Sequence, residues 1–205
     1  MKKSMILSIA MVFMFYDMGV AGAPHQIGGF VLGKHISDYK EMIKMGSGIP
    51  IRHQKYFHEL ETKELEGFKS GYIWIGNCSK PGRIVRIKLK YLDSTKKFYK
   101  LLLKRFKEKF GEPSEWRGDP FHVVIAWKWS FVDKESNRIS LILQHNTKDQ
   151  EEKIGNSVKL TTTNMIEEER LCYEKKSDAS GKDMKRKTHE AKNKAPINWD
   201  LFVPR

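Results

Sequence analysis

The sequence predicts an α+β domain, with an antiparallel sheet and helices packed on one face of it. Several segments alternate apolar and polar residues and are joined by short turns, which is typical of antiparallel strands with one buried face. Three further segments carry helix signals, two of them with an apolar face at helical spacing. Strands grouped in hairpins with separate helices indicate the α+β class, and their order suggests two strand-helix-hairpin units.

The first half of the chain predicts short elements. Residues 27–32 form a short strand interrupted by glycines, and residues 37–45 form a helix capped by its first serine. The Gly- and Pro-containing stretch 46–50 stops that helix. Residues 57–65 suit either a helix or an exposed strand, and we favour a strand that pairs with residues 71–76.

The second half gives clearer patterns. In residues 83–91, apolar side chains alternate with Arg86, Lys88 and Lys90, as in a half-buried strand. Gly111 and Pro113 end the helix that follows. The predicted order is strand 83–91, helix from 93 or 94 to 110, strands 122–131, 139–143 and 157–163, and a helix from 164 to about 175.

The N-terminus has the layout of a secretory signal peptide, which we assign to residues 1–22. Two lysines precede the apolar run 5–16, and small residues occupy positions 19–23. The run is shorter than the ~20 residues that a membrane span needs. Because Pro24 disfavours cleavage directly before it, we expect cleavage after Ala21 or Gly22. The mature protein is therefore expected to be exported, periplasmic or extracellular, with no transmembrane span; the alternative is an uncleaved N-terminal anchor.

Composition indicates one ordinary domain with a basic charge. Hydrophobic residues make up 40% of the chain and aromatic residues 11%, which is enough for a core. The formal net charge is +13, which favours anionic partners at low salt. Outside the cytoplasm these are phospholipid or lipopolysaccharide head groups, wall polymers or acidic proteins, and no nucleic acid is expected. The alternative is that the charge serves solubility alone.

The two cysteines, Cys78 and Cys172, predict a disulfide. An even pair in an exported protein is typically oxidised. Their spacing does not match a zinc or a redox motif. The alternatives are two buried thiols or a bridge between two chains.

Five basic residues are expected to share one face of the sheet, and we call this set the basic face. Arg86, Lys88 and Lys90 project to the same side of their strand, and Lys128 and Lys159 occupy the polar positions of theirs. If these strands are neighbours, the basic face can contact anionic head groups or wall polymer, including a membrane surface. The alternative is a solvated face whose lysines discourage pairing between sheet edges.

No catalytic residue, cofactor or metal site is predicted. His122 and His145 flank one hairpin but should point to opposite faces of the sheet. The loop 111–120 carries Glu115 and Asp119, which a glycosidase could use as its two carboxyl groups. A turn-stabilising contact between Arg117 and a carboxylate explains the same residues.

Three functions fit these observations. We favour an exported, non-catalytic binding or interaction module of the cell envelope. The alternative is a wall- or glycan-directed hydrolase that uses Glu115 and Asp119. A third reading, a carrier of a small apolar ligand, requires a cavity beneath Trp127 and Trp129, although strand tryptophans usually belong to the core.

The C-terminal region changes character. Residues 23–176 form the predicted domain, whereas residues 177–205 are polar, lysine-rich and without apolar periodicity, as in a disordered tail. The tail ends with apolar side chains that predict either a segment for docking to a partner or a return onto the body. These residues are Trp199, Leu201, Phe202 and Val203.

One run of the chain resembles known exported proteins. Residues 82–88, then Phe110-Gly111-Glu112-Pro113, then Trp127-Lys128-Trp129, are similar in layout to small exported bacterial proteins of unknown function. The same layout resembles SmpA/BamE-type envelope modules. That resemblance implies an interaction protein that helps outer-membrane assembly complexes. Members of that family carry a lipidated cysteine, which this sequence lacks.

Overall fold

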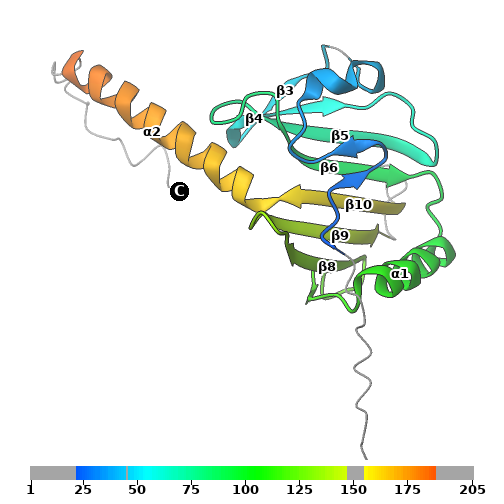
Figure 1. The fold of residues 1–205 in the computed structure, drawn as a ribbon. Helices are drawn as coiled ribbons and strands as arrows, with labels where there is room; N and C mark the ends of the chain where they lie inside the picture. Colours follow the sequence, from blue (N-terminus) through cyan, green and yellow to red (C-terminus); the bar gives the residue numbers. More distant parts are fainter. Residues whose placement is uncertain (1–21, 45, 147–154, 188–205) are drawn as a thin grey trace, which may run out of the picture.

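A computed structural model describes residues 22–44, 46–146 and 155–187 and contains one large antiparallel sheet (Figure 1). The order of its eight strands is β3-β4-β5-β6-β10-β9-β8-β7. The α+β prediction, a sheet with helices packed against it, is confirmed. The elements are β1 Gln26–Ile27, β2 Phe30–Val31, the 3-10 helix η1 Ile36–Met42, β3 Ile49–Ile51, β4 Gln54–Glu61, β5 Phe68–Gly76, β6 Ile84–Tyr91, α1 Lys96–Phe110, β7 Glu115–Trp116, β8 Val124–Val132, β9 Arg138–Asn146, β10 Gly155–Thr162 and α2 Thr163–Lys187.

Two meanders meet in the middle of the sheet. Strands β3 to β6 pair in chain order, and so do strands β7 to β10. The last strands of the two meanders, β6 and β10, pair with each other, with Lys88 opposite Lys159. The two halves that the sequence suggested are therefore each a helix followed by a four-stranded meander.

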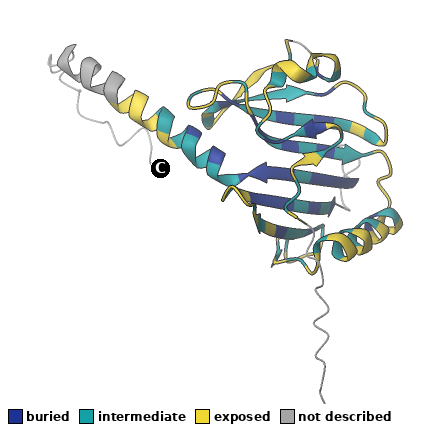
Figure 2. Cartoon of the chain, in the orientation of Figure 1, coloured by how far each residue is buried: buried dark blue, intermediate teal, exposed yellow. Residues whose placement is uncertain are grey.

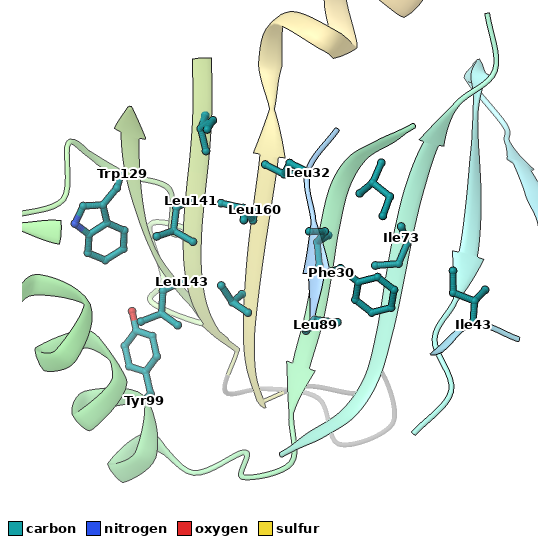
Figure 3. Packing of buried hydrophobic residues seen from close by; sticks show 14 residues of the cluster. Phe30, Leu32, Ile43, Ile73, Leu89, Tyr99, Trp129, Leu141, Leu143 and Leu160 are labelled. Carbon is teal, nitrogen blue, oxygen red and sulfur yellow. The ribbon is translucent and has the colours of Figure 1, made fainter. Parts of the chain in front are cut away.

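The apolar side chains of the central strands form the core. Ile87 and Leu89 of β6 are fully buried, which confirms the alternation predicted for this strand from Arg86 onward. Val85 instead joins a second buried cluster with Phe57 and Met165, where the pairing of β5 with β6 shifts register. The central strands β9 and β10 are largely buried (Figure 2). Tyr99 of α1 and Phe30 of the N-terminal segment pack against the same face of the sheet (Figure 3). Trp129 belongs to this core and donates its indole N–H to the carbonyl of Gly111 over 2.8 Å.

Helix α1 has defined ends. Its N-cap is Thr95, whose hydroxyl accepts the N–H of Phe98; Asp93, one of the two expected caps, instead accepts the N–H of Thr95. At the other end, Gly111 adopts a φ of 77°, which confirms it as the C-terminal cap.

The first half differs from expectation in its short elements. Residues 27–32 form the two-residue strands β1 and β2, joined by Gly28 and Gly29 with φ of 56° and 84°. The expected helix is the shorter 3-10 helix η1. Pro50, expected to stop that helix, lies in β3 at the sheet edge, where its missing N–H costs little. The ambiguous residues 57–65 are largely strand, as favoured, because β4 pairs with β5.

Several boundaries differ in the second half: β9 extends to Asn146, and β10 begins at Gly155. The strand expected from His122 begins at Val124, because Asp119 accepts the N–H groups of Phe121 and Val124 and closes a turn that holds His122 at a φ of 54°. Helix α2 continues to Lys187 and projects away from the sheet (Figure 1), so the boundary expected at residue 177 lies inside the helix.

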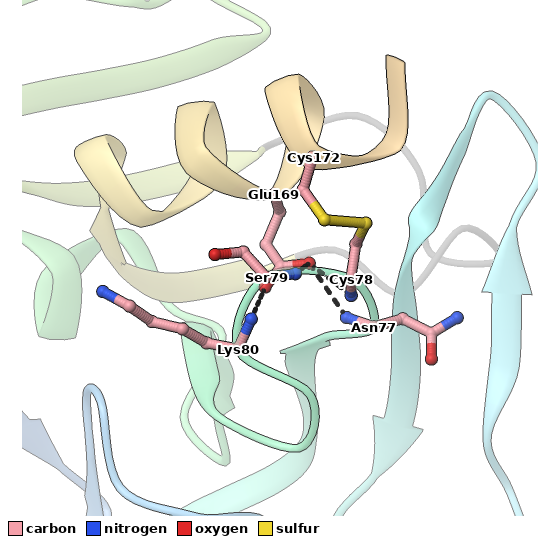
Figure 4. Close-up of a disulfide and its surroundings, with 6 residues drawn as sticks. All are labelled: Asn77, Cys78, Ser79, Lys80, Glu169 and Cys172. Carbon is pink, nitrogen blue, oxygen red and sulfur yellow. Dashed lines mark hydrogen bonds between the residues drawn. A yellow bond between two sulfur atoms is a disulfide. The ribbon is translucent and has the colours of Figure 1, made fainter. Parts of the chain in front are cut away.

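Helix α2 is fastened to the β5–β6 loop by the predicted disulfide. Cys78 and Cys172 are bonded, with their Cα atoms 5.9 Å apart (Figure 4). Glu169, one turn before Cys172, is 1% exposed and receives backbone N–H groups from the same loop. Its Oε2 accepts from Asn77, Cys78 and Ser79 at 3.1, 2.7 and 3.1 Å, and its Oε1 from Lys80 at 2.5 Å.

Candidate functional site

The strand register brings the basic face together. Lys159 of β10 lies opposite Lys88 of β6 on one side and opposite Ile142 of β9 on the other. Ile142 in turn lies opposite Lys128 of β8, so these four side chains form one row across the sheet. Arg86 and Lys90 occupy the neighbouring rows, opposite Thr161 and Ser157. All five predicted residues therefore share the face opposite the core.

The basic face lies at the centre of the sheet. Strands β6 and β10 are the fourth and fifth of the eight strands, and neither is an edge. A role in preventing edge-to-edge pairing therefore does not explain Lys88 and Lys159. Like charges directly opposite each other destabilise a strand pair. Their presence at this position calls for another explanation.

A groove of about 420 Å³ opens on this face. Four cationic side chains line it, namely Arg86, Arg117, Lys128 and Lys159. The hydroxyls of Ser140 and Thr161 and the side chains of Ile142 and Ile166 also line it, and no acidic residue does so within the described part of the chain. We call this feature the basic groove.

The basic groove differs in membership from the predicted basic face. Lys88 and Lys90 lie beside it rather than in its lining. Arg117 was predicted as the partner of a carboxylate but not as a member of the basic face, because it follows the short strand β7 in a stretch without any periodic pattern. The backbone N–H of Arg117 donates to the carbonyl of Ala126 over 2.9 Å, and this bond carries the arginine to the groove as an extension of the sheet.

Arg86 is held in place by Trp74 and Thr161. Its guanidinium lies 3.7 Å from the centre of the Trp74 ring, and its Nε donates to the Thr161 hydroxyl over 3.3 Å. The indole N–H of Trp74 donates to Glu59 over 2.5 Å, which fixes the ring beneath the arginine. Burial lowers the pKa of Arg86 to about 10.

Lys159 is a cation in an unfavourable place. Burial, together with the positive charges of Arg86, Lys88 and Arg117, lowers its pKa to about 8. An anion bound in the groove would offset both effects. Perturbed lysines of this kind are common at functional sites.

Glu115 neutralises one end of the basic groove. Its carboxylate lies 2.9 Å from Arg117 Nε and 3.0 Å from Lys128 Nζ. The hydrogen bond from Lys128 is the main reason that the pKa of Glu115 is lowered. The expected contact between Arg117 and a carboxylate is thus present.

The two acids of the hydrolase hypothesis have structural partners. The pKa of Asp119 is lowered chiefly by the backbone N–H of Val124, in the turn described above. A glycosidase needs one carboxyl group with a raised pKa to protonate the leaving group. Both Glu115 and Asp119 are shifted in the opposite direction, so the geometry gives the hydrolase hypothesis no support.

The histidines have different surroundings. His145 is buried, with its Nδ1 2.8 Å from Asn156 Oδ1 and its ring stacked on Tyr99. His122 packs instead beside Trp116 on the β7–β8 loop. Among the residues that the structure describes, no three His, Cys, Asp or Glu side chains are grouped to hold a metal ion.

A second cavity, of about 1040 Å³, lies where the N-terminal segment, the β8–β9 turn and α2 approach one another. It has mixed charge, including His25, whose Nε2 is 3.4 Å from Asp133 Oδ2. Neither cavity is lined by Trp127 or Trp129. The carrier hypothesis needs space at those tryptophans, and Trp129 is instead packed in the core at 2% exposure.

Comparison with protein-family models, with curated proteins and with solved structures gives no match. The layout resemblance to SmpA/BamE-type modules therefore remains a prediction. No helix within the described ranges is long and apolar enough to cross a membrane. The proposed signal peptide, except Gly22, and the docking residues Trp199, Leu201, Phe202 and Val203 lie outside the described residues.

Proposed function

We propose that this chain is an exported, non-catalytic binding module that holds an anionic component of the cell envelope against the basic face of its sheet. The observation that carries the proposal is the direct opposition of Lys88 and Lys159 on the two central strands. The sheet tolerates this repulsion where an apolar or neutral pair would be more stable. A bound anion supplies the missing counter-charge.

Export is supported by two features. The first 22 residues have the signal-peptide layout, and the disulfide between Cys78 and Cys172 suits an oxidising compartment, periplasmic or extracellular. The anionic partner and the exported location of the chain are therefore both proposed.

Binding rather than catalysis is favoured by the lining of the basic groove. Its charged members attract anions, and the Glu115 carboxylate beside it forms ion pairs with Arg117 and Lys128. A hydrolytic site requires a proton acceptor or nucleophile poised beside the substrate. No Asp, Glu, His or Cys lines this groove among the described residues, and Lys159, with a pKa of about 8, mostly keeps its proton at pH 7.

The proposal is tested by vesicle cosedimentation of the chain without residues 1–22. We expect it to sediment with vesicles containing phosphatidylglycerol and not with phosphatidylcholine alone, and to be released by salt. The variant Lys88→Glu/Lys90→Glu should lose this binding. The matched control Lys96→Glu/Lys100→Glu makes the same charge change at exposed positions of α1 and should keep it.

Equal loss in both variants would mean that net charge alone drives association, and the basic face would then be a solvated surface. Retention by both variants would exclude the basic face as the contact. Purified anionic wall polymer in place of vesicles extends the same comparison to the other class of envelope anion.

A further inference from the structure

The four cations of the basic groove fall into two unequal pairs. Arg117 and Lys128 share the Glu115 carboxylate, whereas Arg86 and Lys159 form no ion pair with any described carboxylate. The positive charge of Arg86 is balanced only at longer range by Glu59, and that of Lys159 is opposed by like charges. The end of the groove between Arg86 and Lys159 is therefore the place where an incoming anion gains most.

The donors at this end suit a ligand with several acceptor oxygens. Arg86 lines the groove and uses its Nε and one flat face in contacts with Thr161 and Trp74, while its guanidinium has two further nitrogens that can donate. Lys159 brings an ammonium with three donors. Thr161, only 4% exposed, accepts from Arg86 through its hydroxyl oxygen, so its own proton is a further donor.

The charge and number of these donors distinguish between anions. A carboxylate has one negative charge and two oxygens, and Glu115 already shows how the other end of the groove accommodates one. A phosphate monoester carries about −1.5 to −2 at pH 7 and presents three strong acceptor oxygens. It therefore matches two desolvated cations with a neighbouring hydroxyl better than a carboxylate does.

The apolar part of the groove accommodates the remainder of such a ligand. Ile142 lies between Lys128 and Lys159 in the cross-strand row, and Ile166 approaches from the first turns of α2. The volume of about 420 Å³ is within the range of small-molecule sites and exceeds the need of a bare phosphate ion. An organic group attached to the phosphate can thus rest on the isoleucines.

From this arrangement we infer that the basic groove is a phosphate-monoester site, with Arg86, Lys159 and Thr161 holding the phosphoryl oxygens and Ile142 and Ile166 contacting the esterified group. The inference rests on the proposed function and narrows it to one ligand chemistry. A soluble phosphate ester and a phosphomonoester lipid head group share that chemistry, and the experiment separates these two sources.

The experiment is calorimetric titration of the chain without residues 1–22, at low salt and pH 7, with glycerol 3-phosphate as the soluble probe. Vesicles of phosphatidylcholine with phosphatidic acid provide the lipid probe, and glycerate provides the carboxylate comparison. We expect Lys159→Met to lose roughly tenfold to a hundredfold in affinity, as for the loss of a charged hydrogen-bond donor. The control Lys100→Met, exposed on α1, should bind like the wild type.

A second readout distinguishes a direct contact from a change in overall charge. At pH 8, phosphate binding should be accompanied by proton uptake, seen as a difference in binding enthalpy between buffers of different ionisation enthalpy. The groups facing Lys159 are Arg86 and Lys88 from β6, Lys128 from β8, Arg117 after β7, and Glu115 behind the last two. Because the pKa of Lys159 is lowered to about 8, its ammonium is the expected source of this uptake, and Lys159→Met should abolish it.

The possible results separate the phosphate-monoester inference from the proposed function. Binding of glycerol 3-phosphate that depends on Lys159 supports the site with a soluble ligand, and Lys159-dependent binding of phosphatidic acid alone supports it with a lipid. Glycerate binding as tightly as the phosphate ester would overturn the inference. So would vesicle binding that needs Lys88 and Lys90 but not Lys159, although the proposed function would then stand. Absence of binding to any anion would overturn both.

Discussion

Replacing Lys159 by methionine should stabilise the ligand-free protein while weakening its binding. The substitution keeps an unbranched side chain of similar length and removes a charge that burial and three like charges oppose. A change that improves stability at the expense of function is typical of residues kept for binding. The stability of this variant therefore tests the electrostatic reasoning separately from any ligand.

The magnitude follows from the pKa of Lys159. A fall from 10.5 to about 8 corresponds to ~3 kcal/mol of unfavourable interaction with the charged form. Because the side chain is only partly buried, solvent screening reduces the expected gain in unfolding free energy to about 1–2 kcal/mol at pH 7. The control Lys100→Met should stay within about 0.5 kcal/mol of the wild type.

The pH dependence has a definite sign. Below pH 8 the lysine is charged in both the folded and the unfolded chain, so its cost is fully present. Between pH 8 and 10.5 the unfolded chain binds more protons at this site, and the wild type gains stability relative to the variant as pH rises. The advantage of Lys159→Met should therefore be largest at pH 7 and vanish near pH 10.5.

Urea denaturation at pH 7, 8.5 and 10, followed by tryptophan fluorescence, measures this difference. If Lys159→Met is less stable than the wild type at pH 7, the ammonium makes favourable contacts and the argument for a strained cation is wrong. A difference that stays constant with pH would mean that packing, not charge, is responsible.

Two further predictions concern the attachment of α2. Glu169→Gln should lower the unfolding free energy by about 2–4 kcal/mol, because an amide cannot accept from all four N–H groups of the loop and leaves at least one unsatisfied. Urea denaturation measures this loss, and a value under about 1 kcal/mol would mean that water replaces the carboxylate. Replacing Cys78 and Cys172 by alanine should cost about 4–5 kcal/mol on the chain-entropy estimate for a separation of 94 residues, again measured in urea. Adding a reductant should lower the stability of the wild type but not of this variant, and equal sensitivity in both would exclude the bridge as the cause.

The strands with one buried face were predictable because their pattern is local. The alternation through Ile87 and Leu89 fixes which side of β6 faces the core, and it also predicts that Arg86, Lys88 and Lys90 point the other way. The cysteine pairing was predictable for a different reason, since only one intramolecular partner exists for Cys78.

The missed features depend on long-range contacts. Arg117 reaches the basic groove only because β7 pairs with β8, and a two-residue strand has no periodic signal. Glu169 occurs in a run of three glutamates that looks like an exposed helix face, and nothing in the sequence distinguishes it from its neighbours. Its environment is created by a loop about ninety residues earlier in the chain.

The meeting of the two meanders at β6 and β10 means that the basic groove does not exist in either half alone. Arg86 comes from the first meander, while Arg117, Lys128 and Lys159 come from the second. A folding chain can form each meander from neighbouring strands, but the basic groove forms only when the two halves join. A ligand bound across this junction would favour the joined state by mass action. The bond between Cys78 and Cys172 also links the two halves, so oxidation would hold them in the arrangement that forms the groove.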